Sequence, residues 1–539
     1  MESVDNRRPL SGNESKYLKI FSTLTLIILL SCTSTRSTGD KRVEGSAVPQ
    51  DNVPASAIQG SVFGPPQEFV GSPYKEINTS GLFNVHPLET CRIAVLHNGD
   101  DSFAARIQAL KNADTSVRIQ ALTFTGDESG LYITELLKGK KVQGLDVRVI
   151  IDGLANPWVQ TQWRYFDLKQ NGIEVEGYET FYLQWLNELP MASHDAADKT
   201  TNPNKRFHEK MWIIDGGTDH GVAILGGANI ANEYFRIDPQ NPSRYWRDQD
   251  VIVKGDVVKD MVATFERNFE YFLKIKESRG VFNTNIYWEA TRKVLNKTGT
   301  VNMYHITDKR LNKNVRELAY KKLDLKYEDA KCRFFQNRPR FGETYIEQAY
   351  LKLIKGAKKE ILIGNAYFVA SKKFVETVKD VVRRCVKVII LTNSPETNDL
   401  PMLTIVGRDY YDDILVVNKE SLVQSFDEGG VQIWEWQGRR THAAEQTEGT
   451  MHAKFAVFDR RISIVGSYNL DPRSRTLNSE SVIVFENEAL SRHLADMFYK
   501  NDLDFSKQIT LEDTKAFTES KDAIYQLRKQ FGTLIEDNL

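Results

Sequence analysis

Apolar residues along the chain follow helical and strand-like periods in alternation. Residues 103–130 combine an amphipathic helix pattern with a strand-like run, and residues 345–371 repeat that order. A second helix pattern and a buried strand follow in each case, at 131–153 and at 374–394. Alternating strand and helix patterns are typical of α/β proteins. The sequence therefore predicts an α/β fold made of two similar halves.

A nine-residue phrase occurs late in each half. Residues 207–215 read FHEKMWIID and residues 451–459 read MHAKFAVFD, so both contain His-x-Lys, four mostly apolar residues and Asp. Chance would produce one such match in roughly a few per cent of similar chains. An apolar run ending in Gly-Gly-x-Asn follows the first phrase, and one ending in Gly-Ser-x-Asn follows the second. We infer an internal duplication whose lobes are related by a pseudo-two-fold axis around one shared active site.

The duplication predicts the organisation of the chain, with each lobe a mixed β-sheet flanked by helices. The expected segments are a signal-like leader at 1–32, a flexible tether at 33–85, lobe 1 at 86–290, a connection at 291–340, lobe 2 at 341–510 and a C-terminal helix at 511–539. The connection is rich in Lys and Arg with weak strand content, so we expect a solvated helix there.

The two phrases carry the candidate chemistry. β-Branched and aromatic residues in MWII and FAVF predict a strand that enters a tight turn at the Asp. Residues two apart in a strand share a face, so each His lies beside its Lys, and each Asn can arrive there from the return strand. The side chains are His208 and Lys210, His452 and Lys454, and Asn229 and Asn469. Imidazole, ammonium and carboxamide together suit an anion with a reactive bond.

Two copies of this constellation are explained by a phosphodiester substrate. In-line displacement at phosphorus needs a nucleophile on one side and a proton donor for the leaving oxygen on the other. One His can attack while the other protonates the departing alkoxide, and the Lys and Asn side chains can hold the non-bridging oxygens. Both phrases are therefore expected to form one active site.

Each His also needs an orienting partner on its other ring nitrogen. The first half offers Asp248 in WRDQDVIV, and the second offers Glu480 in LNSESVIV, with registers that differ by one residue before the Val-Ile run. The remaining motif residues are expected to be structural: Asp215, Asp459, Gly226, Gly227, Gly466 and Ser467. No carboxylate cluster of metal-ligand type accompanies the motifs, so we expect neither a metal nor another cofactor.

Composition changes this picture little. The chain has 41% hydrophobic and 27% charged residues and a net charge of −1, which is ordinary for a globular protein and gives no reason to expect nucleic acid as a partner. Its four cysteines are far apart in sequence and too few for a disulfide scaffold, and Cys385 opens an apolar run that predicts a buried side chain.

The amino terminus is more informative. Lys16 and Lys19 precede about a dozen mainly apolar residues that end at Leu-Leu-Ser-Cys, a length typical of a signal peptide and short for a membrane span. The junction resembles a bacterial lipoprotein signal, with Cys32 as the lipidated residue. Residues 33–85 are rich in Ser, Thr, Gly and Pro, as expected of a tether. We therefore expect a protein of the bacterial cell envelope, attached to a membrane surface through Cys32, with an uncleaved apolar anchor as the alternative.

The duplicated His-x-Lys-x4-Asp with Gly-Gly/Ser-x-Asn resembles the phospholipase D superfamily, from about Asp101 to Asp504. The stretches GSYNLDPRSRTLNSE and VKVIILTNSPETND resemble the C-type bacterial cardiolipin synthases. The resemblance implies a phosphohistidine-linked phosphatidyl intermediate that passes to an alcohol or to water. The implied substrate is phosphatidylglycerol, alone or together with phosphatidylethanolamine. The resemblance also implies that His208 or His452 is the nucleophile, and favours His208. The first hairpin is longer than the second, and His220 within it is expected to lie on the surface.

Three alternatives stay open at this point. A hydrolytic phospholipase D would use the same residues and differ only in its acceptor. A nuclease of the superfamily would favour clustered Arg and Lys near the motifs, against which stand the net charge and the leader. A non-enzymatic lipid-binding protein would commonly lack a catalytic His or Lys, whereas both pairs are intact here. The oligomeric state does not follow from the sequence.

Overall fold

The protein was analysed as a computed structural model. It describes residues 89–153, 155–156, 159–178, 206–237, 245–278, 313–424, 430–438, 449–520 and 522–534. The chain divides into two compact units, Met1–Gln59 and Gly60–Leu539, and all described residues belong to the second. The predicted leader at 1–32 with Cys32, and the tether at 33–85, lie outside the described residues.

The first half alternates strands and helices as its apolar pattern predicts. Its strands are β1 (Glu89–Leu96), β2 (Ser116–Ala121), β3 (Asp146–Ile151), β4 (Glu174–Glu176), β5 (Met211–Ile214), β6 (Val222–Gly226), β7 (Trp246–Arg247) and β8 (Asp250–Gly255). Its helices are α2 (Gly99–Asn112), α3 (Glu128–Val142), α4 (Val159–Gln170), α6 (Asn232–Phe235) and α7 (Val257–Ser278). The Asn98 side chain caps α2 by accepting the Asp101 N–H, as N-cap residues do.

The second half repeats this order. Its strands are β9 (Glu328–Asn337), β10 (Glu360–Asn365), β11 (Lys387–Asn393), β12 (Val431–Trp436), β13 (Thr450–Met451), β14 (Lys454–Phe458), β15 (Ile462–Gly466), β16 (Glu480–Glu486) and β17 (Ser506–Ile509). Its main helices are α10 (Tyr345–Gly356), α11 (Lys372–Val382), α12 (Pro401–Gly407), α13 (Tyr411–Leu415), α14 (Ser421–Gln424), α15 (Pro472–Thr476) and α16 (Glu488–Met497). The C-terminal segment, predicted as one helix at 511–539, contains two helices, α17 (Leu511–Thr518) and α18 (Ala523–Leu534).

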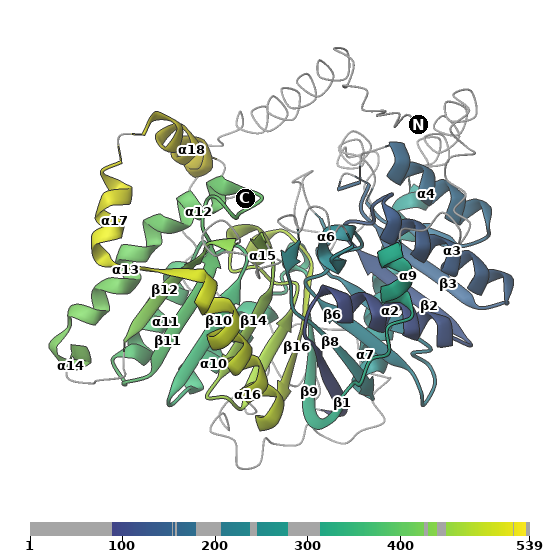
Figure 1. The fold of residues 1–539 in the computed structure, drawn as a ribbon, viewed down its shortest axis with the longest axis horizontal. Helices are drawn as coiled ribbons and strands as arrows, with labels where there is room; N and C mark the ends of the chain where they lie inside the picture. Colours follow the sequence, from purple (N-terminus) through teal and green to yellow (C-terminus); the bar gives the residue numbers. More distant parts are fainter. Residues whose placement is uncertain are drawn as a thin grey trace, which may run out of the picture. The chain divides into compact units, whose positions relative to one another are not determined.

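The described strands of both halves, apart from β7 and β13, join one mixed sheet whose order is symmetric about its centre. The order is β17-β12-β11-β10-β14-β15-β16-β9-β1-β8-β6-β5-β2-β3-β4. Outward from the β9–β1 pair, each strand of one half has a counterpart in the other, and β17 is an addition at one edge. Figure 1 shows β1 and β9 side by side between the two sets of strands. The α/β fold with two duplicated lobes is confirmed.

The seam between the halves corrects two expectations. β1 and β9 pair antiparallel from Glu89↔Cys332 to Ile93↔Glu328. β9 therefore lies in the segment predicted as a connection at 291–340, where weak strand content led us to expect a solvated helix. Only a short helix, α9 (Lys313–Ala319), is described there, and lobe 2 begins at Glu328 instead of residue 341.

A disulfide crosses the same seam. Cys91 and Cys332 are bonded although 241 residues separate them. The four cysteines had suggested no disulfide, because sequence spacing does not reveal which strands become neighbours. Cys385 is a free cysteine, and it is exposed instead of buried. It lies at the turn before β11 with φ 69°, outside the apolar run that was expected to bury it.

Three apolar cores hold the sheet and helices together. One contains residues of α2 and α3 against strands of the first half, and another contains residues of α10 and α11 against strands of the second. A third core combines strand residues from both halves with α7 and α16, for example Val251, Phe265, Phe455 and Leu494. Burial of this shared core fixes the position of one half relative to the other. No helix of the described residues is long and apolar enough to cross a membrane.

Candidate active site

The two halves exchange short backbone pairings where the repeated phrases begin. Phe207 forms a parallel bridge with Ser479, and Met451 pairs in parallel with Arg247 in the small β13–β7 sheet. The residue before each motif His is thus paired with the residue before the acid of the other half. Because both pairings cross the lobe boundary, the two phrases are brought to one place.

The motif histidines are oriented by acids of the opposite lobe. His208 Nδ1 lies 3.0 Å from a carboxylate oxygen of Glu480, and His452 Nδ1 lies 2.7 Å from one of Asp248. The backbones of the two lobes are also joined at this point, because the His208 N–H donates to the Ser479 carbonyl at 2.7 Å. Both acids were candidates from the sequence. Only the fold shows that each acid orients the His of the opposite lobe. With Nδ1 facing a carboxylate, Nε2 of each ring is left for substrate.

The two acids occupy equivalent positions in their strands. Gly226 pairs with Asp250, and Gly466 pairs with Val482, so Asp248 and Glu480 each lie two residues before the partner of the motif glycine. The distances from the two acids to their Val-Ile runs differ by one residue in the sequence, but the acids occupy equivalent positions in their strands. Strand pairing, and not the position of the apolar run, shows which residues of the two halves are equivalent.

The motif lysines contact the backbone of their histidines, and both lysines are buried. Lys210 Nζ donates to the His208 carbonyl at 2.7 Å, and Lys454 Nζ donates to the His452 carbonyl. Each ammonium is held by the backbone of its own phrase, which fixes the charge beside the imidazole. The sequence argument that residues two apart lie together is consistent with these contacts.

Burial sets the protonation of the site. It lowers the pKa of His208 and of His452 well below the usual range, and the nearby ammonium groups lower both further. Burial also lowers the pKa of Lys210 to about 7 and that of Lys454 to about 8. Neutral imidazoles beside lysines that titrate near neutrality fit a site that awaits an anion, because a bound phosphate would favour the charged lysines.

Burial acts on the acids in the opposite direction. It raises the pKa of Asp248 to about 6 and that of Glu480 to about 7, against the opposing charges of the two motif lysines. Two acids and two lysines within one buried cluster balance in charge when all are ionised. Such a balance limits the cost of holding these groups away from water.

The two motif asparagines differ in their contacts. The Asn229 side chain accepts the Thr123 N–H at 3.1 Å and donates to the Tyr234 hydroxyl at 3.0 Å. Oδ1 of Asn469 is buried and has no hydrogen-bond partner among the described residues. No hydrogen bond within the described chain joins either amide to its motif His or Lys, so their predicted role toward substrate stays a prediction.

The Gly-Gly and Gly-Ser elements fit the acids that they face. A Cβ at Gly227 would approach Asp248 Oδ1 to 2.1 Å, so no larger residue is accommodated there. In the second half Ser467 stands in that place and its hydroxyl donates to Glu480 at 2.6 Å. Gly226 has φ 159°, and a Cβ at Gly466 would reach the Ser481 carbonyl at 2.3 Å. Close strand packing therefore requires glycine at both first positions.

The motif aspartates hold turns away from the histidines. Asp215 has φ 52° and accepts the N–H groups of Asp114, Thr115 and Ser116 at 2.8 to 3.3 Å. Asp459 has φ 51° and accepts the N–H groups of residues 358–360 in the same manner. These contacts bind the end of each His-x-Lys strand to the start of its neighbour, which is what a structural role requires.

Several site neighbours were not found by sequence reasoning. Trp246 and Tyr234 contact the His452 ring, with centroids 4.9 and 5.3 Å away. Ser474 donates to Glu480 at 2.6 Å. Glu209 is fully buried within the first phrase and accepts from Gln120 and Gln336. The serine two places after LDP could have been noticed as a local donor, whereas the aromatic contacts depend on the lobe arrangement.

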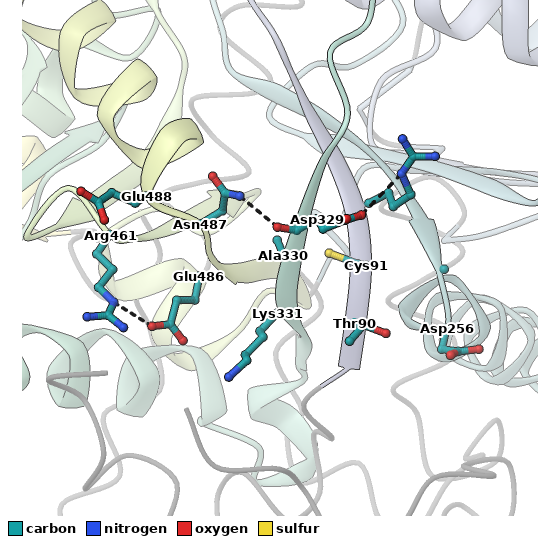
Figure 2. Close-up of a pocket in the computed structure, with 12 residues that line it drawn as sticks. Thr90, Cys91, Asp256, Asp329, Ala330, Lys331, Arg461, Glu486, Asn487 and Glu488 are labelled. Carbon is teal, nitrogen blue, oxygen red and sulfur yellow. Dashed lines mark hydrogen bonds and ion pairs between the residues drawn. The ribbon is translucent and has the colours of Figure 1, made fainter. Parts of the chain in front are cut away.

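A cluster of metal-ligand type and a large cavity among the described residues include neither motif histidine. Asp114, Asp215 and His220 could approach one ion, but Asp215 is occupied by backbone N–H groups and His220 is exposed. A cavity of about 800 Å³ lies beside the seam (Figure 2), where Arg461 pairs with Glu486 and Asn487 donates to the Asp329 carbonyl. Its lining contains no histidine, so it does not compete as the catalytic site.

Comparisons with known proteins agree with this arrangement. The family model described as cardiolipin synthase, PLD-like domain, matches residues 106–273 and 350–502, which are the two halves. The chain is similar to a cardiolipin synthase from Halalkalibacterium halodurans, with 26% identity over 78% of this chain and 67% of the relative. It is also similar to cardiolipin synthase C from Escherichia coli K12, with 25% identity over 80% of this chain and 89% of the relative.

One solved structure has the same fold. The crystal structure of phosphatidylserine synthase from Haemophilus influenzae Rd KW20 matches with a TM-score of 0.55 and 16% identity, and the match covers 83% of this chain and 95% of that chain. At this identity the likeness concerns the fold alone. It extends across both halves, so the pairing of two lobes is a feature of that fold.

Proposed function

We propose that this chain, which belongs to the family of cardiolipin synthase, phospholipase D-like domains, is a phosphatidyltransferase that forms cardiolipin from phosphatidylglycerol. The observation that carries the proposal is the reciprocal site, in which each motif His is oriented by the acid of the other lobe. Neither half can supply an oriented His alone. A site with two such imidazoles suits a two-step displacement at phosphorus.

In the first step, Nε2 of one His attacks the lipid phosphorus. A P–N bond forms, the bond to the head-group oxygen breaks, and the other His, protonated at Nε2 once the anionic phosphate is bound, gives that proton to the departing alkoxide. Lys210 and Lys454 would hold the non-bridging oxygens, whose charge grows in the transition state. The result is a phosphatidyl group on one imidazole and a free head-group alcohol.

In the second step, an acceptor hydroxyl reacts on the side that the head group has left. The His that acted as acid now takes the hydroxyl proton, the oxygen bonds to phosphorus, and the P–N bond breaks. With phosphatidylglycerol as acceptor the product is cardiolipin, and with water it is phosphatidic acid. The hydrolytic reaction is the second candidate, since it uses the same residues.

Product analysis tests the proposal. Purified protein would be incubated with vesicles of phosphatidylglycerol, with and without phosphatidylethanolamine, and the lipid products identified. Cardiolipin should exceed phosphatidic acid. Phosphatidic acid alone would assign the enzyme as a hydrolase, and cleavage of DNA without lipid turnover would overturn the lipid assignment.

We also propose attachment to the bacterial envelope membrane through lipidated Cys32. The support is the sequence alone: an apolar run that ends at Leu-Leu-Ser-Cys, followed by a Ser/Thr-rich tether. Such a tether would let a two-lobed enzyme reach lipid head groups from an anchored terminus.

A further inference from the structure

An arginine precedes the first motif His and has no counterpart in the second half. Arg206 lies two residues before His208, and the matching position before His452 is Thr450. Arg206 is buried, and its Nε is 3.5 Å from Asp152. The Arg206 carbonyl accepts the Ser479 N–H at 3.0 Å, which fixes this residue in the same backbone pairing that positions His208.

A second arginine follows the second motif Asn, and the first half again differs. Arg473 lies four residues after Asn469, whereas the residue four positions after Asn229 is Glu233. Arg473 is half-buried in α15, and its carbonyl accepts the Asn478 N–H at 2.8 Å. This short helix leads directly into the strand that carries the acid for His208. The duplicated site is therefore asymmetric in charge at two matched positions.

Backbone hydrogen bonds place Arg206 and Arg473 near each other and near His208: Ser479 pairs with both Arg206 and His208, and its neighbour Asn478 donates to Arg473. After burial, the charge of Arg206 is the largest influence that lowers the pKa of Arg473, which is about 10. The charge of Arg473 also lowers the pKa of His208. Asp152 and Asp471 offset part of this positive charge. Bringing two guanidinium groups together in a buried place costs free energy that an anion between or beside them would offset.

The His452 side of the site has a different character. Its nearest rings are those of Trp246 and Tyr234. Arg247 is also on this side, but its guanidinium pairs with both oxygens of Asp502 at 2.8 and 3.1 Å. Arg206 and Arg473 thus lie on the His208 side of the site, and Arg247, paired with Asp502, lies on the His452 side.

We propose that Arg206 and Arg473 form a subsite for a second phosphodiester, the head-group phosphate of the phospholipid that accepts the phosphatidyl group. This inference rests on the proposed function. The transferred phosphate occupies the histidines and Lys210 and Lys454, so an anionic acceptor brings a second negative charge that needs its own partners. Guanidinium groups bind phosphate oxygens through paired N–H donors. A neutral acceptor or water makes no use of the subsite.

Two acceptors that differ only in a phosphodiester test the subsite. Full-length protein, with phosphatidylcholine vesicles that contain phosphatidylglycerol as donor, would receive either labelled glycerol or labelled glycerophosphoglycerol. The wild type should prefer glycerophosphoglycerol. Arg206→Gln and Arg473→Gln should each reduce that preference by at least about tenfold, because a hydrogen bond to a charged group is lost. The ratio of the two transfer rates removes any change that is common to both acceptors, such as one caused through His208, and Arg473→Lys should restore part of the preference.

Glu233→Gln is the matched control, since it alters the equivalent position of the other lobe and should leave the preference unchanged. Equal loss with both acceptors in the arginine variants would overturn the subsite and indicate a structural or catalytic role. An unchanged preference would overturn it as well. A wild type that transfers to glycerol without preferring the phosphodiester would contradict the subsite alone, whereas a wild type that turns over no phospholipid would contradict the proposed function.

Discussion

Glu480 lies 3.0 Å from His208, and 272 residues of chain separate the two. The reciprocal contact, between Asp248 and His452, spans 204 residues. An acid that orients an imidazole is usually sought near it in sequence or in the same lobe. Here the orientation of each His depends on correct assembly of both lobes. The active site is therefore complete only when the two lobes have assembled.

The exchange of acids predicts which ring each substitution disturbs. Asp248→Asn should shift the imidazole nitrogen resonances of His452 and leave those of His208 in place, and Glu480→Gln should do the reverse. Activity should fall by roughly 10²–10⁴-fold in each variant, because a His without its orienting acid adopts the wrong tautomer. Nitrogen NMR of the histidines checks this, and a disturbance of the ring in the same lobe would contradict the exchange.

Removal of either motif His should abolish turnover. In His208→Ala the site loses one of its two roles, nucleophile or acid, and in His452→Ala it loses the other. Lys210→Ala and Lys454→Ala should cost on the order of 2.7–4 kcal/mol of transition-state stabilisation, as loss of an oxyanion donor does. Rates on phosphatidylglycerol vesicles measure these effects. His220→Ala, which alters an exposed side chain, is the control. Near-normal activity in either motif His variant would contradict the inference that both histidines serve one active site.

Chelation should leave activity largely intact. The imidazoles supply the nucleophile and acid, and the lysines supply the charge that a divalent ion would otherwise provide. Rates before and after EDTA treatment measure this. Complete loss that one divalent ion restores would contradict the expectation, whereas modest stimulation by calcium would not, because calcium also binds anionic lipid surfaces.

Stability should fall with rising pH through Glu89. Burial, followed by the charges of Asp260 and Asp256, raises the pKa of Glu89 from 4.5 to about 8. Because the folded protein holds this proton when the unfolded chain has lost it, the contribution to stability is present at low pH and is lost as pH rises through that window. Melting temperatures from pH 5 to 9 should decline less for Glu89→Gln than for wild type. The exposed Glu376→Gln serves as control, and parallel curves for wild type and Glu89→Gln would refute the assignment.

Replacement of Cys32 tests the anchor. If Cys32 carries lipid, Cys32→Ser should move much of the protein from the membrane to the soluble fraction, since membrane attachment scales with the buried acyl chains. Cys385→Ser, which removes the exposed free cysteine, should fractionate as wild type. An unchanged membrane fraction for Cys32→Ser would mean that the apolar run itself is the anchor.

Local patterns in the sequence were enough to predict the duplication, the α/β class and the set of motif side chains. A spacing of two residues keeps His208 and Lys210 together, and Lys210 donates to the His208 carbonyl although both residues precede β5. The lobe that supplies Glu480 to His208 could not be predicted, because spacing along the chain carries no information on which face meets which. β9 was missed for a related reason: its first residues are charged, and its apolar character is evident only once β1 and β16 lie on either side.

The seam has a consequence for biosynthesis. β1 is made early, and its second neighbour, β9, leaves the ribosome only some 240 residues later. During that interval the first half presents β1 as an open edge strand, with backbone donors and acceptors that lack their final partner. The strand that finally pairs with this edge, β9, is the pseudo-symmetric counterpart of β1. The β1 edge of a stalled or truncated first half could therefore pair with the β1 edge of another such chain in nearly the same way. Premature termination would therefore favour self-association of half-length chains, and rapid completion of the second half protects against it.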